Sequence, residues 1–386
     1  MNIYIYLRKT MTQNNKNIGL AIIGCGRVGR MRGKIASEFP GISWIGLCDT
    51  NKEIGEKLKE DISADYFTTD YSDLINRPEV DAVIIATSTW SHYEPTLIAI
   101  NNKQKLFIEK PMATDAIQSL ELLKLIQDNG IDVCLGYTQR FRRRFMVVRE
   151  RVKTGQIGEI SCAFTRAFMN SMAPLNETRL TQDRRFLTPM VVSGTHSLDM
   201  ALWIMNDTPV SVYAKSSDKI LFDAGTKDAT CGIFTLASGA IWSMNISWAL
   251  PKIWPGASYG LEMGFVGTRG VIDIEDTHRD VIIASEYDQG KIYRPAGRED
   301  EVTRNVDFLT SFPPGDIYNG ELWGPMKEET FSWLQRICLD KATPHASAED
   351  GHRNLILTMA MDLSAKLGKE ISLPISADDL MSGLNE

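Results

Sequence analysis

The stretch IGLAIIGCGRVG, residues 18–29, decides the fold of this chain. Its apolar first half is typical of a buried strand, and its second half has the pattern G-x-G-x-x-G. Gly24 allows a tight turn out of the strand, Gly26 has no Cβ and lets a pyrophosphate approach the backbone, and Gly29 lets the following helix pack closely on the strand. The stretch therefore predicts a strand, a turn and a helix that together bind a dinucleotide.

Residues 27–38 are expected to form that helix. The N–H groups of its first turn, which includes Arg27 and Val28, would face the phosphates, and the helix dipole favours negative charge there. A glycine-rich turn is a weak signal on its own, so the prediction depends on the segments that follow it.

An acidic residue follows the next strand. The apolar segment 44–48 ends at Asp49, 20 residues after Gly29. A carboxylate at this spacing accepts hydrogen bonds from both ribose hydroxyls of NAD and repels the 2′-phosphate of NADP. Thr50 and Asn51 come next in place of an arginine, and Thr50 is counted with the cofactor contacts. We therefore predict NAD as the cofactor; the alternative for Asp49 is the N-cap of the helix that follows.

Strands and helices alternate through the rest of the first 140 residues, which predicts a doubly wound α/β domain with a parallel sheet. Further strands are expected at 65–68, 80–86, 106–108 and 133–137, and helices at 52–60, 71–76, 93–101 and 114–129.

The strand at 80–86 leads into a polar stretch that contains Thr87, Thr89 and His92. Ligands of such sheets bind beyond the carboxyl ends of the strands, so these three residues are predicted cofactor contacts. For His92, a cap on the helix that starts at the next residue is an equal alternative.

The strand at 106–108 runs into Glu109-Lys110-Pro111. A lysine at that strand end, next to a carboxylate and a proline, is expected at the nicotinamide edge of the sheet, and Glu109 and Lys110 are both predicted cofactor contacts. The bond between Lys110 and Pro111 is a candidate for the cis form, because X-Pro bonds allow it in tight turns. The alternative is an ordinary turn with an exposed lysine.

Beyond residue 140 the pattern changes to strands that alternate apolar and polar residues, which indicates an antiparallel sheet with one covered face. The predicted strands are 159–168, 210–216, 230–236, 240–249, 259–266, 270–275, 281–285 and 371–374; the predicted helices are 146–154, 196–205, 327–339 and 348–367; and a long loop is expected over 287–319. We therefore divide the chain into an N-terminal extension (1–17), a dinucleotide-binding domain (18–140) and a second α/β domain for substrate binding and oligomerisation (141–386).

Composition and charge exclude several classes of protein. The 386 residues suffice for two domains, and 43 % hydrophobic with 24 % charged residues is typical of a globular protein. The net charge of −7 argues against a nucleic-acid or membrane-surface role, and no apolar run approaches transmembrane length. The six cysteines are scattered without a C-x-x-C or Cys/His cluster, so neither disulfides nor a metal site are expected, and a reducing, cytoplasmic setting is favoured. The extension has no signal-peptide core, and Met11 is a second candidate start.

Taken together, these residues resemble the glucose–fructose oxidoreductase / inositol dehydrogenase / MocA family over nearly the whole chain. The resemblance is carried by residues 24–29, 87–92, 109–111, 136–141 (GYTQRF), 155–159 (GQIGE), 194–199 (GTHSLD) and 348–351 (AEDG). It implies a Rossmann domain followed by an α/β domain with a large, open, mostly antiparallel sheet, which is often used for oligomer contacts and here favours a homodimer or homotetramer. It also implies NAD(P) and a sugar, inositol or related polyol as substrate, with Lys110 near the reacting carbon and His196 as the catalytic histidine.

One departure from the family pattern concerns the base. Many dehydrogenases of this family have an aspartate four residues before the histidine, where this chain has Val192. Without that carboxylate His196 lacks the expected partner, so Lys110 would carry more of the proton transfer, or Thr195 would help to position the substrate. The usual residues after the Gly-aromatic pair are also altered, at 138–141.

Oxidation of a secondary alcohol by NAD moves a hydride to the nicotinamide and a proton to a base. His196 is the natural base because its ordinary pKa, about 6.5, lies near working pH, and Lys110 would hold the hydroxyl and stabilise the developing negative charge. The alternative for His196 is a buried histidine at a helix start that bonds to the backbone. Further candidates for the substrate side, each with core packing or surface exposure as its simpler alternative, are Arg140, Arg166, Asn170, Trp203, Trp242 and Trp248.

Three functions fit the sequence. The first is an NAD-dependent dehydrogenase of a sugar, sugar derivative or cyclitol. The second is a redox-neutral enzyme that oxidises its substrate transiently to allow an elimination, as some glycosidases that resemble this family do, and Val192 keeps it open. The third is a non-catalytic sensor that binds NAD and a protein partner, which the presence of Lys110 and His196 disfavours.

Overall fold

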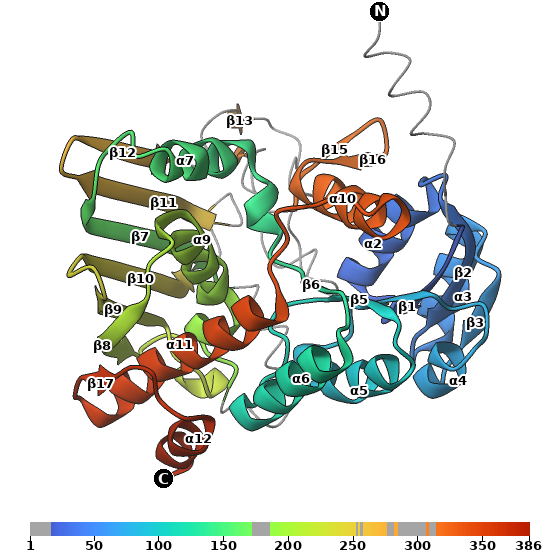
Figure 1. The fold of residues 1–386 in the computed structure, drawn as a ribbon, viewed down its shortest axis with the longest axis horizontal. Helices are drawn as coiled ribbons and strands as arrows, with labels where there is room; N and C mark the ends of the chain where they lie inside the picture. The colour runs from blue at the N-terminus through green and yellow to red at the C-terminus, as the bar shows by residue number, and fades with distance from the viewer. Residues whose placement is uncertain are drawn as a thin grey trace, which may run out of the picture. The chain divides into compact units, whose positions relative to one another are not determined.

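The computed structural model describes residues 17–171, 186–251, 254, 258–275, 282–284, 306–308 and 314–386. These residues form two compact units (Figure 1). The first contains the described residues up to 113 together with 118–137 and 320–351, and the second contains the others. All but the last residue of the predicted extension, and most of the predicted loop at 287–319, lie outside the described residues.

A six-stranded sheet forms the centre of the first unit. Its order is β3-β2-β1-β4-β5-β6, and all neighbouring strands are parallel. The strands are β1 (Ile18–Ile23), β2 (Ile42–Cys48), β3 (Tyr66–Thr68), β4 (Ala82–Ile85), β5 (Lys105–Ile108) and β6 (Val133–Leu135). The strand order reverses between β1 and β4, and ligands of such sheets bind beyond the carboxyl ends of the strands at that point. The predicted doubly wound domain is confirmed.

Helices accompany this sheet and bury its two faces. They are α2 (Arg27–Ser37), α3 (Lys52–Ile62), α4 (Tyr71–Ile75), α5 (Tyr93–Asn101), α6 (Ala116–Asn129) and α10 (Pro325–Leu339), with a 3-10 turn, η1 (Thr89–Ser91). Alternate residues of β1 enter two separate cores, Leu20 and Ile22 one of them, Ala21 and Ile23 the other. All six residues of β1 are buried, as expected for a central parallel strand.

One helix of the first unit comes from late in the sequence. Helix α10 lies against α2 (Figure 1), and its Trp333 ring meets the ring of Phe107 in β5 edge to face, with the centroids 5.5 Å apart. Leu334 and Ile337 are buried in the same core. The sequence analysis placed this helix in the second domain because it follows that domain in order; its apolar face is instead buried with the first sheet.

A seven-stranded sheet forms the centre of the second unit, in the order β12-β11-β7-β10-β9-β8-β17. Its strands are β7 (Ile160–Asn170), β8 (Pro209–Ser217), β9 (Ala229–Leu236), β10 (Ile241–Leu250), β11 (Ser258–Gly267), β12 (Gly270–Glu275) and β17 (Ile371–Ser372). Within this sheet β7 and β10 pair in parallel, and the other neighbours are antiparallel. The predicted mostly antiparallel sheet is confirmed.

One face of this sheet is covered and the other is open. Trp242 and Trp248 of β10 are buried, whereas Ile241 of the same strand and Ile233 of β9 are exposed. Helix α9 (Thr195–Met205) packs against β7, and Trp248 Nε1 donates a hydrogen bond to the hydroxyl of Ser193, just before α9. The covered face is therefore the one that α9 contacts.

The remaining described elements are not strands of either sheet. They are η2 (Thr138–Phe141), α7 (Arg143–Lys153), the π-helix η3 (Pro189–Gly194), η4 (Phe222–Ala224), α11 (Ala348–Leu367), α12 (Ala377–Asn385) and the short strand pairs β13 (Ile282–Ala284) with β14 (Val306–Phe308) and β15 (Asp316–Tyr318) with β16 (Glu321–Trp323). The sequence analysis did not predict η3 or α12. None of the helices in the described ranges has the length and apolar character needed to cross a lipid bilayer.

Candidate dinucleotide-binding and catalytic site

The three glycines after β1 differ in what surrounds them. A Cβ on Gly29 would lie 1.8 Å from the carbonyl oxygen of Gly24. A Cβ on Gly24, whose φ is 95°, would lie 2.6 Å from the carbonyl oxygen of Ala86. Both positions therefore need glycine for the fold itself. A Cβ on Gly26 would meet no atom of the described residues within 4 Å, so this space is open to a ligand.

Helix α2 begins directly after Gly26, and no side chain caps it. Gly26 and Arg27 are exposed, Val28 is half-buried, and the first turn carries no acidic residue. The Arg30 N–H donates to the Gly26 carbonyl oxygen at 2.8 Å, so the N–H groups before Arg30 precede the helical ladder. A helix start of this kind favours an anion.

The side chain of Asp49 lies at the glycine turn. Its Oδ2 accepts the N–H of Cys25 at 2.7 Å, and its Oδ1 accepts the N–H of Asn51 at 2.8 Å. Asn51 is the N-cap of α3, so the alternative that Asp49 caps this helix is wrong. The half-buried carboxylate keeps lone pairs with which it can accept ribose hydroxyls, and Thr50 beside it is exposed.

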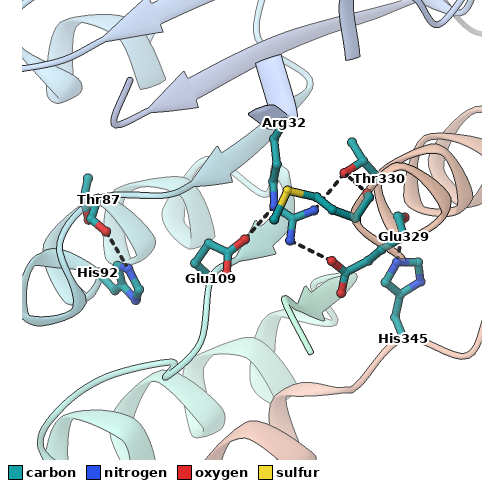
Figure 2. Close-up of polar contacts among 8 residues, drawn as sticks. Arg32, Thr87, His92, Glu109, Glu329, Thr330 and His345 are labelled. Atoms are coloured by element: carbon teal, nitrogen blue, oxygen red, sulfur yellow. Dashed lines mark hydrogen bonds and ion pairs between the residues drawn. The ribbon is translucent and has the colours of Figure 1, made fainter. Parts of the chain in front are cut away.

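The ring of His92 is only 1 % exposed and joins two loops. Its Nδ1 lies 2.8 Å from the carbonyl oxygen of Pro111. Its Nε2 lies 3.3 Å from the carbonyl oxygen of Thr87, the contact drawn in Figure 2. Burial is the main reason why the pKa of His92 is lowered. The side chain makes no capping bond to α5. The structure thus gives His92 a further role, which is to hold together the loops after β4 and β5, and its predicted contact with the cofactor stays a prediction.

Two threonines follow β4 in the sequence. Thr87 and Thr89 are half-buried. The hydroxyl oxygen of Thr89 is buried and has no hydrogen-bond partner within the described residues. A buried hydroxyl without a partner is costly, and a bound ligand would satisfy it.

The carboxylate of Glu109 points into the fold. Its Oε1 accepts the Nε–H of Arg32 in α2 at 2.6 Å (Figure 2). A Cβ on Gly136 would lie 2.8 Å from Oε2, so this glycine makes room for the carboxylate. Glu109 is therefore paired with Arg32, and its predicted contact with the cofactor stays a prediction. The bond between Lys110 and Pro111 is cis, and Lys110 is half-buried.

In the second unit, His196 is the second residue of α9. The π-helix η3 runs directly into α9. The hydroxyl of Thr188 caps the start of η3 by accepting the N–H of Val191. Thr195 is buried and His196 is half-buried. Val192 lies within η3, so that helix has no carboxylate at the position where the sequence comparison expected one.

Arg140, a predicted substrate contact, forms a buried ion pair. Its Nε and Nη2 donate to the two oxygens of Asp199 in α9 at 2.7 and 2.6 Å, and Asn354 Nδ2 donates to the same carboxylate at 2.9 Å. Arg140 is only 3 % exposed. Arg140 thus forms a two-pronged bond to Asp199, and its predicted contact with substrate stays a prediction.

The other predicted substrate contacts are also engaged within the unit. Arg166 forms an ion pair with Glu262 of β11 at 2.5 Å. Its neighbours in β7, Thr165 and Ala167, are buried, so Arg166 lies on the open face of the sheet, opposite α9. This placement does not support a contact with the same ligand as His196.

Asn170, Trp242 and Trp248 follow the simpler alternative of core packing, whereas Trp203 is half-buried. Asn170 is buried and donates to two backbone carbonyl groups, and Trp242 and Trp248 are fully buried. Trp203 lies under the guanidinium of Arg149, 4.5 Å from the ring centroid.

Both units match known family descriptions. Residues 18–137 match "Oxidoreductase family, NAD-binding Rossmann fold", and residues 145–273 match "GFO/IDH/MocA C-terminal domain". The chain belongs to the GFO/IDH/MocA family of oxidoreductases. The resemblance seen in the sequence is confirmed.

Relatives in this family span much of the chain. An uncharacterized oxidoreductase YrbE of Bacillus subtilis is 25 % identical over 93 % of this chain and 97 % of the relative. An inositol 2-dehydrogenase of Rhizobium meliloti is 26 % identical over 58 % of this chain and 66 % of the relative. A 2,7-anhydro-N-acetylneuraminate hydratase of Mediterraneibacter gnavus is 30 % identical over 38 % of each chain.

A solved structure has the same fold. The scyllo-inositol dehydrogenase of Lactobacillus casei, with bound NAD(H) and scyllo-inositol, superposes with a TM-score of 0.74 at 18 % identity and covers 92 % of this chain and 99 % of that one.

The first unit of this GFO/IDH/MocA protein is an NAD-binding Rossmann domain. The open space at Gly26, the uncapped start of α2 and the carboxylate of Asp49 fit a dinucleotide. The unpartnered hydroxyl of Thr89 provides a further polar group in the loop after the neighbouring strand β4.

Sequence reasoning missed three residues around the site. Arg32 forms ion pairs with Glu109 and Glu329, and Asp199 forms an ion pair with Arg140. Asp199 could have been predicted from the sequence, because it follows His196 by three residues on the same helix. Glu329 gave no signal, because it lies 297 residues from Arg32 in the sequence.

Proposed function

We propose that the protein is an NAD-dependent oxidoreductase that transfers hydride between the nicotinamide and a secondary alcohol of a sugar, sugar derivative or cyclitol. The observation that carries the proposal is the open space at Gly26 beside the Asp49 carboxylate, because it suits a pyrophosphate and a ribose at one sheet edge. The similarity to an inositol 2-dehydrogenase supports a polyol substrate.

Bound NAD supplies the hydride acceptor. In this proposal His196 accepts the proton of the substrate hydroxyl at a ring nitrogen, since an imidazole titrates near neutral pH. The ammonium of Lys110 donates a hydrogen bond to the same oxygen and stabilises the negative charge that develops there. Both side chains are half-buried, which leaves each of them part of its surface for a ligand.

Val192 affects how the proton transfer is shared between His196 and Lys110. A carboxylate beside a histidine orients the ring and stabilises its charged form. Val192 provides neither effect, so we propose that Lys110 carries more of the proton transfer than the family pattern implies, which requires its neutral amine to accept the hydroxyl proton and become the ammonium. Thr195, next to His196, is the proposed residue that helps to position the substrate.

The cofactor preference follows from Asp49. Its carboxylate would repel the 2′-phosphate of NADP, so we propose that Asp49→Ala weakens NAD binding and narrows the preference for NAD over NADP. The matched control is Asp65→Ala, which removes a carboxylate that bonds to the Ile45 N–H, away from the glycine turn.

We also propose a homodimer or homotetramer in the cytoplasm. The open face of the second sheet exposes apolar side chains on neighbouring strands, among them Phe164, Tyr213, Ile233 and Ile241. Apolar surface of this kind is typical of a protein interface. All six cysteines are free, which is consistent with a reducing setting.

The decisive experiment incubates the purified protein with NAD and a panel of sugars, cyclitols and glycosides, and follows NADH absorbance and product mass together. We expect net NADH with at least one cyclitol or sugar. Lys110→Ala should lower the single-turnover rate at least about 100-fold while NAD still binds, whereas the exposed Lys57→Ala should not change it. An unchanged rate in Lys110→Ala would remove Lys110 from the mechanism.

A redox-neutral elimination is the second candidate. The missing carboxylate at Val192 and the similarity to a hydratase favour it. Product without net NADH would establish this alternative, and NAD binding without any turnover across the panel would favour a sensor.

A further inference from the structure

The ring of His92 lies between two carbonyl oxygens. Its Nδ1 lies 2.8 Å from the carbonyl oxygen of Pro111, and its Nε2 lies 3.3 Å from the carbonyl oxygen of Thr87. Carbonyl oxygens only accept hydrogen bonds, and a neutral imidazole has a single N–H to donate. In its neutral form the ring can therefore bond to one of these two carbonyl groups and not to both.

The two distances assign the proton to Nδ1. An N–H···O hydrogen bond is about 2.9–3.0 Å long, and two lone pairs repel each other at that separation. The shorter contact with Pro111 therefore needs the N–H, whereas the longer contact with Thr87 can be made without one. Burial is the main cause that lowers the pKa of His92, because a buried ring is costly to charge, so the ring is neutral near pH 7.

The backbone at Thr87 packs directly on the glycine turn. A Cβ on Gly24 would lie 2.6 Å from the carbonyl oxygen of Ala86 and 2.8 Å from the backbone nitrogen of Thr87. These two atoms belong to one peptide bond, at the point where β4 leads into its loop. A shift of the loop after β4 would therefore disturb the turn whose open space at Gly26 suits a pyrophosphate.

His92 is well placed to hold this loop. It ends the loop after β4 and directly precedes α5, and its carbonyl oxygen accepts both the N–H and the hydroxyl of Thr96 in the first turns of that helix. Its backbone is thus fixed at the start of α5, while its ring reaches the buried Pro111 in the loop after β5. The bond from Nδ1 to Pro111 therefore joins the two loops.

We propose that His92 is a positioning residue for NAD: its Nδ1–H bonds to the Pro111 carbonyl and thereby fixes the loop after β4 against the glycine turn. This inference deepens the proposed function and rests on NAD docking at that turn. A buried carbonyl group that loses its donor is costly, so without the Nδ1–H the two loops would separate. They would then have to be ordered each time NAD binds, and the affinity would fall.

Two amide side chains can replace the ring one nitrogen at a time. The amide nitrogen of asparagine is as many bonds from Cβ as Nδ1 is, and that of glutamine is as many bonds away as Nε2. His92→Asn therefore keeps a donor for Pro111, whereas His92→Gln offers its donor to Thr87. Both variants lose the ring, so the loss of packing is common to the pair. The control is His345→Gln, which changes a ring that bonds to the carbonyl of Glu329 in α10.

Calorimetric titration measures the NAD dissociation constant of each variant, and thermal unfolding without NAD is recorded beside it. We expect His92→Asn to bind NAD within about threefold of the parent. His92→Gln should bind at least about fivefold more weakly than His92→Asn, as one lost hydrogen bond of ordinary strength implies. His345→Gln should match the parent. A purely structural role would lower thermal stability and leave the two His92 variants with equal affinity, and that result would overturn the inference.

Nitrogen-15 NMR of the parent gives a second arm that needs no variant to fold. The ring nitrogens of His92 are assigned through bonds from its own backbone, and their couplings to the ring protons show which nitrogen carries hydrogen. At neutral pH we expect the proton on Nδ1. A proton on Nε2 would give the hydrogen bond to Thr87 in place of Pro111, against the inference.

Activity separates this inference from the proposed function. If the parent binds NAD and oxidises nothing in the substrate panel, but the tautomer and the two affinities are as expected, the positioning role of His92 stands and the proposed function fails. If the parent oxidises a polyol and His92→Gln binds NAD as tightly as His92→Asn, the proposed function stands and this inference fails.

Discussion

Gly26→Ala separates cofactor binding from folding. The Gly26 backbone has a φ of −63°, which alanine adopts without strain, and an added Cβ meets no atom of the described residues within 4 Å. Alanine also restricts the unfolded chain more than glycine does. We therefore expect the free energy of unfolding to stay the same or to rise by about 0.4–1 kcal/mol.

The same methyl group would occupy the space that the pyrophosphate needs. One lost hydrogen bond to a charged group is worth about 1.5–3 kcal/mol, and 1.4 kcal/mol is a factor of ten in affinity. NAD binding should therefore weaken by about 10- to 100-fold for each backbone N–H that no longer reaches a phosphate oxygen.

The assay compares NAD titrations by calorimetry with thermal unfolding of the protein without NAD. Gly29→Ala is the matched control, because its Cβ would lie 1.8 Å from the Gly24 carbonyl oxygen and must move the backbone. It should lower the unfolding free energy by about 1–3 kcal/mol or more. If Gly26→Ala binds NAD as tightly as the parent, the phosphates do not dock at this turn and the reasoning fails.

Two further predictions concern the second unit. Burial raises the pKa of Asp362 from 3.8 to about 7, so the folded protein keeps a proton that the unfolded chain has lost, and stability falls as pH rises through this interval. Asp362→Asn retains an acceptor for the Thr188 hydroxyl. We expect this variant to raise the free energy of unfolding by about 2–4 kcal/mol more at pH 8 than at pH 5, as measured by differential scanning calorimetry. An equal increase at both pH values would contradict the prediction. Arg140→Met should lower the free energy of unfolding, measured with urea, by about 3–5 kcal/mol, because it leaves the buried Asp199 carboxylate with only the amide of Asn354. Arg140→Lys should lower it less. A loss below about 1 kcal/mol for the methionine variant would show that stability does not depend on the ion pair.

Local sequence pattern predicted most of the elements of the fold. The glycine turn at 24–29 and the apolar strands that follow it gave the first sheet, because buried parallel strands read as continuous apolar runs. The alternation of apolar and polar residues in β9 and β10 predicted the second sheet with one open face. Helix α10 was assigned to the wrong neighbours in space, because nothing in a helix's own sequence says which core receives its apolar face.

The sequence likewise predicted one part of the candidate site and not another. The sequence located the glycines and Asp49, whose roles depend on backbone geometry within one strand–turn–helix unit and its neighbour. It did not show that Arg140 is committed to Asp199 or Glu109 to Arg32, since the partners are 59 and 77 residues apart.

The sequence by itself determined that this chain forms a Rossmann domain and a mostly antiparallel second sheet, because apolar periodicity and glycine placement act over a few residues. The tertiary structure alone decided which charged side chains are held by partners inside the protein. A charge removed from water must find its opposite, and that opposite can come from any part of the chain that folding brings near.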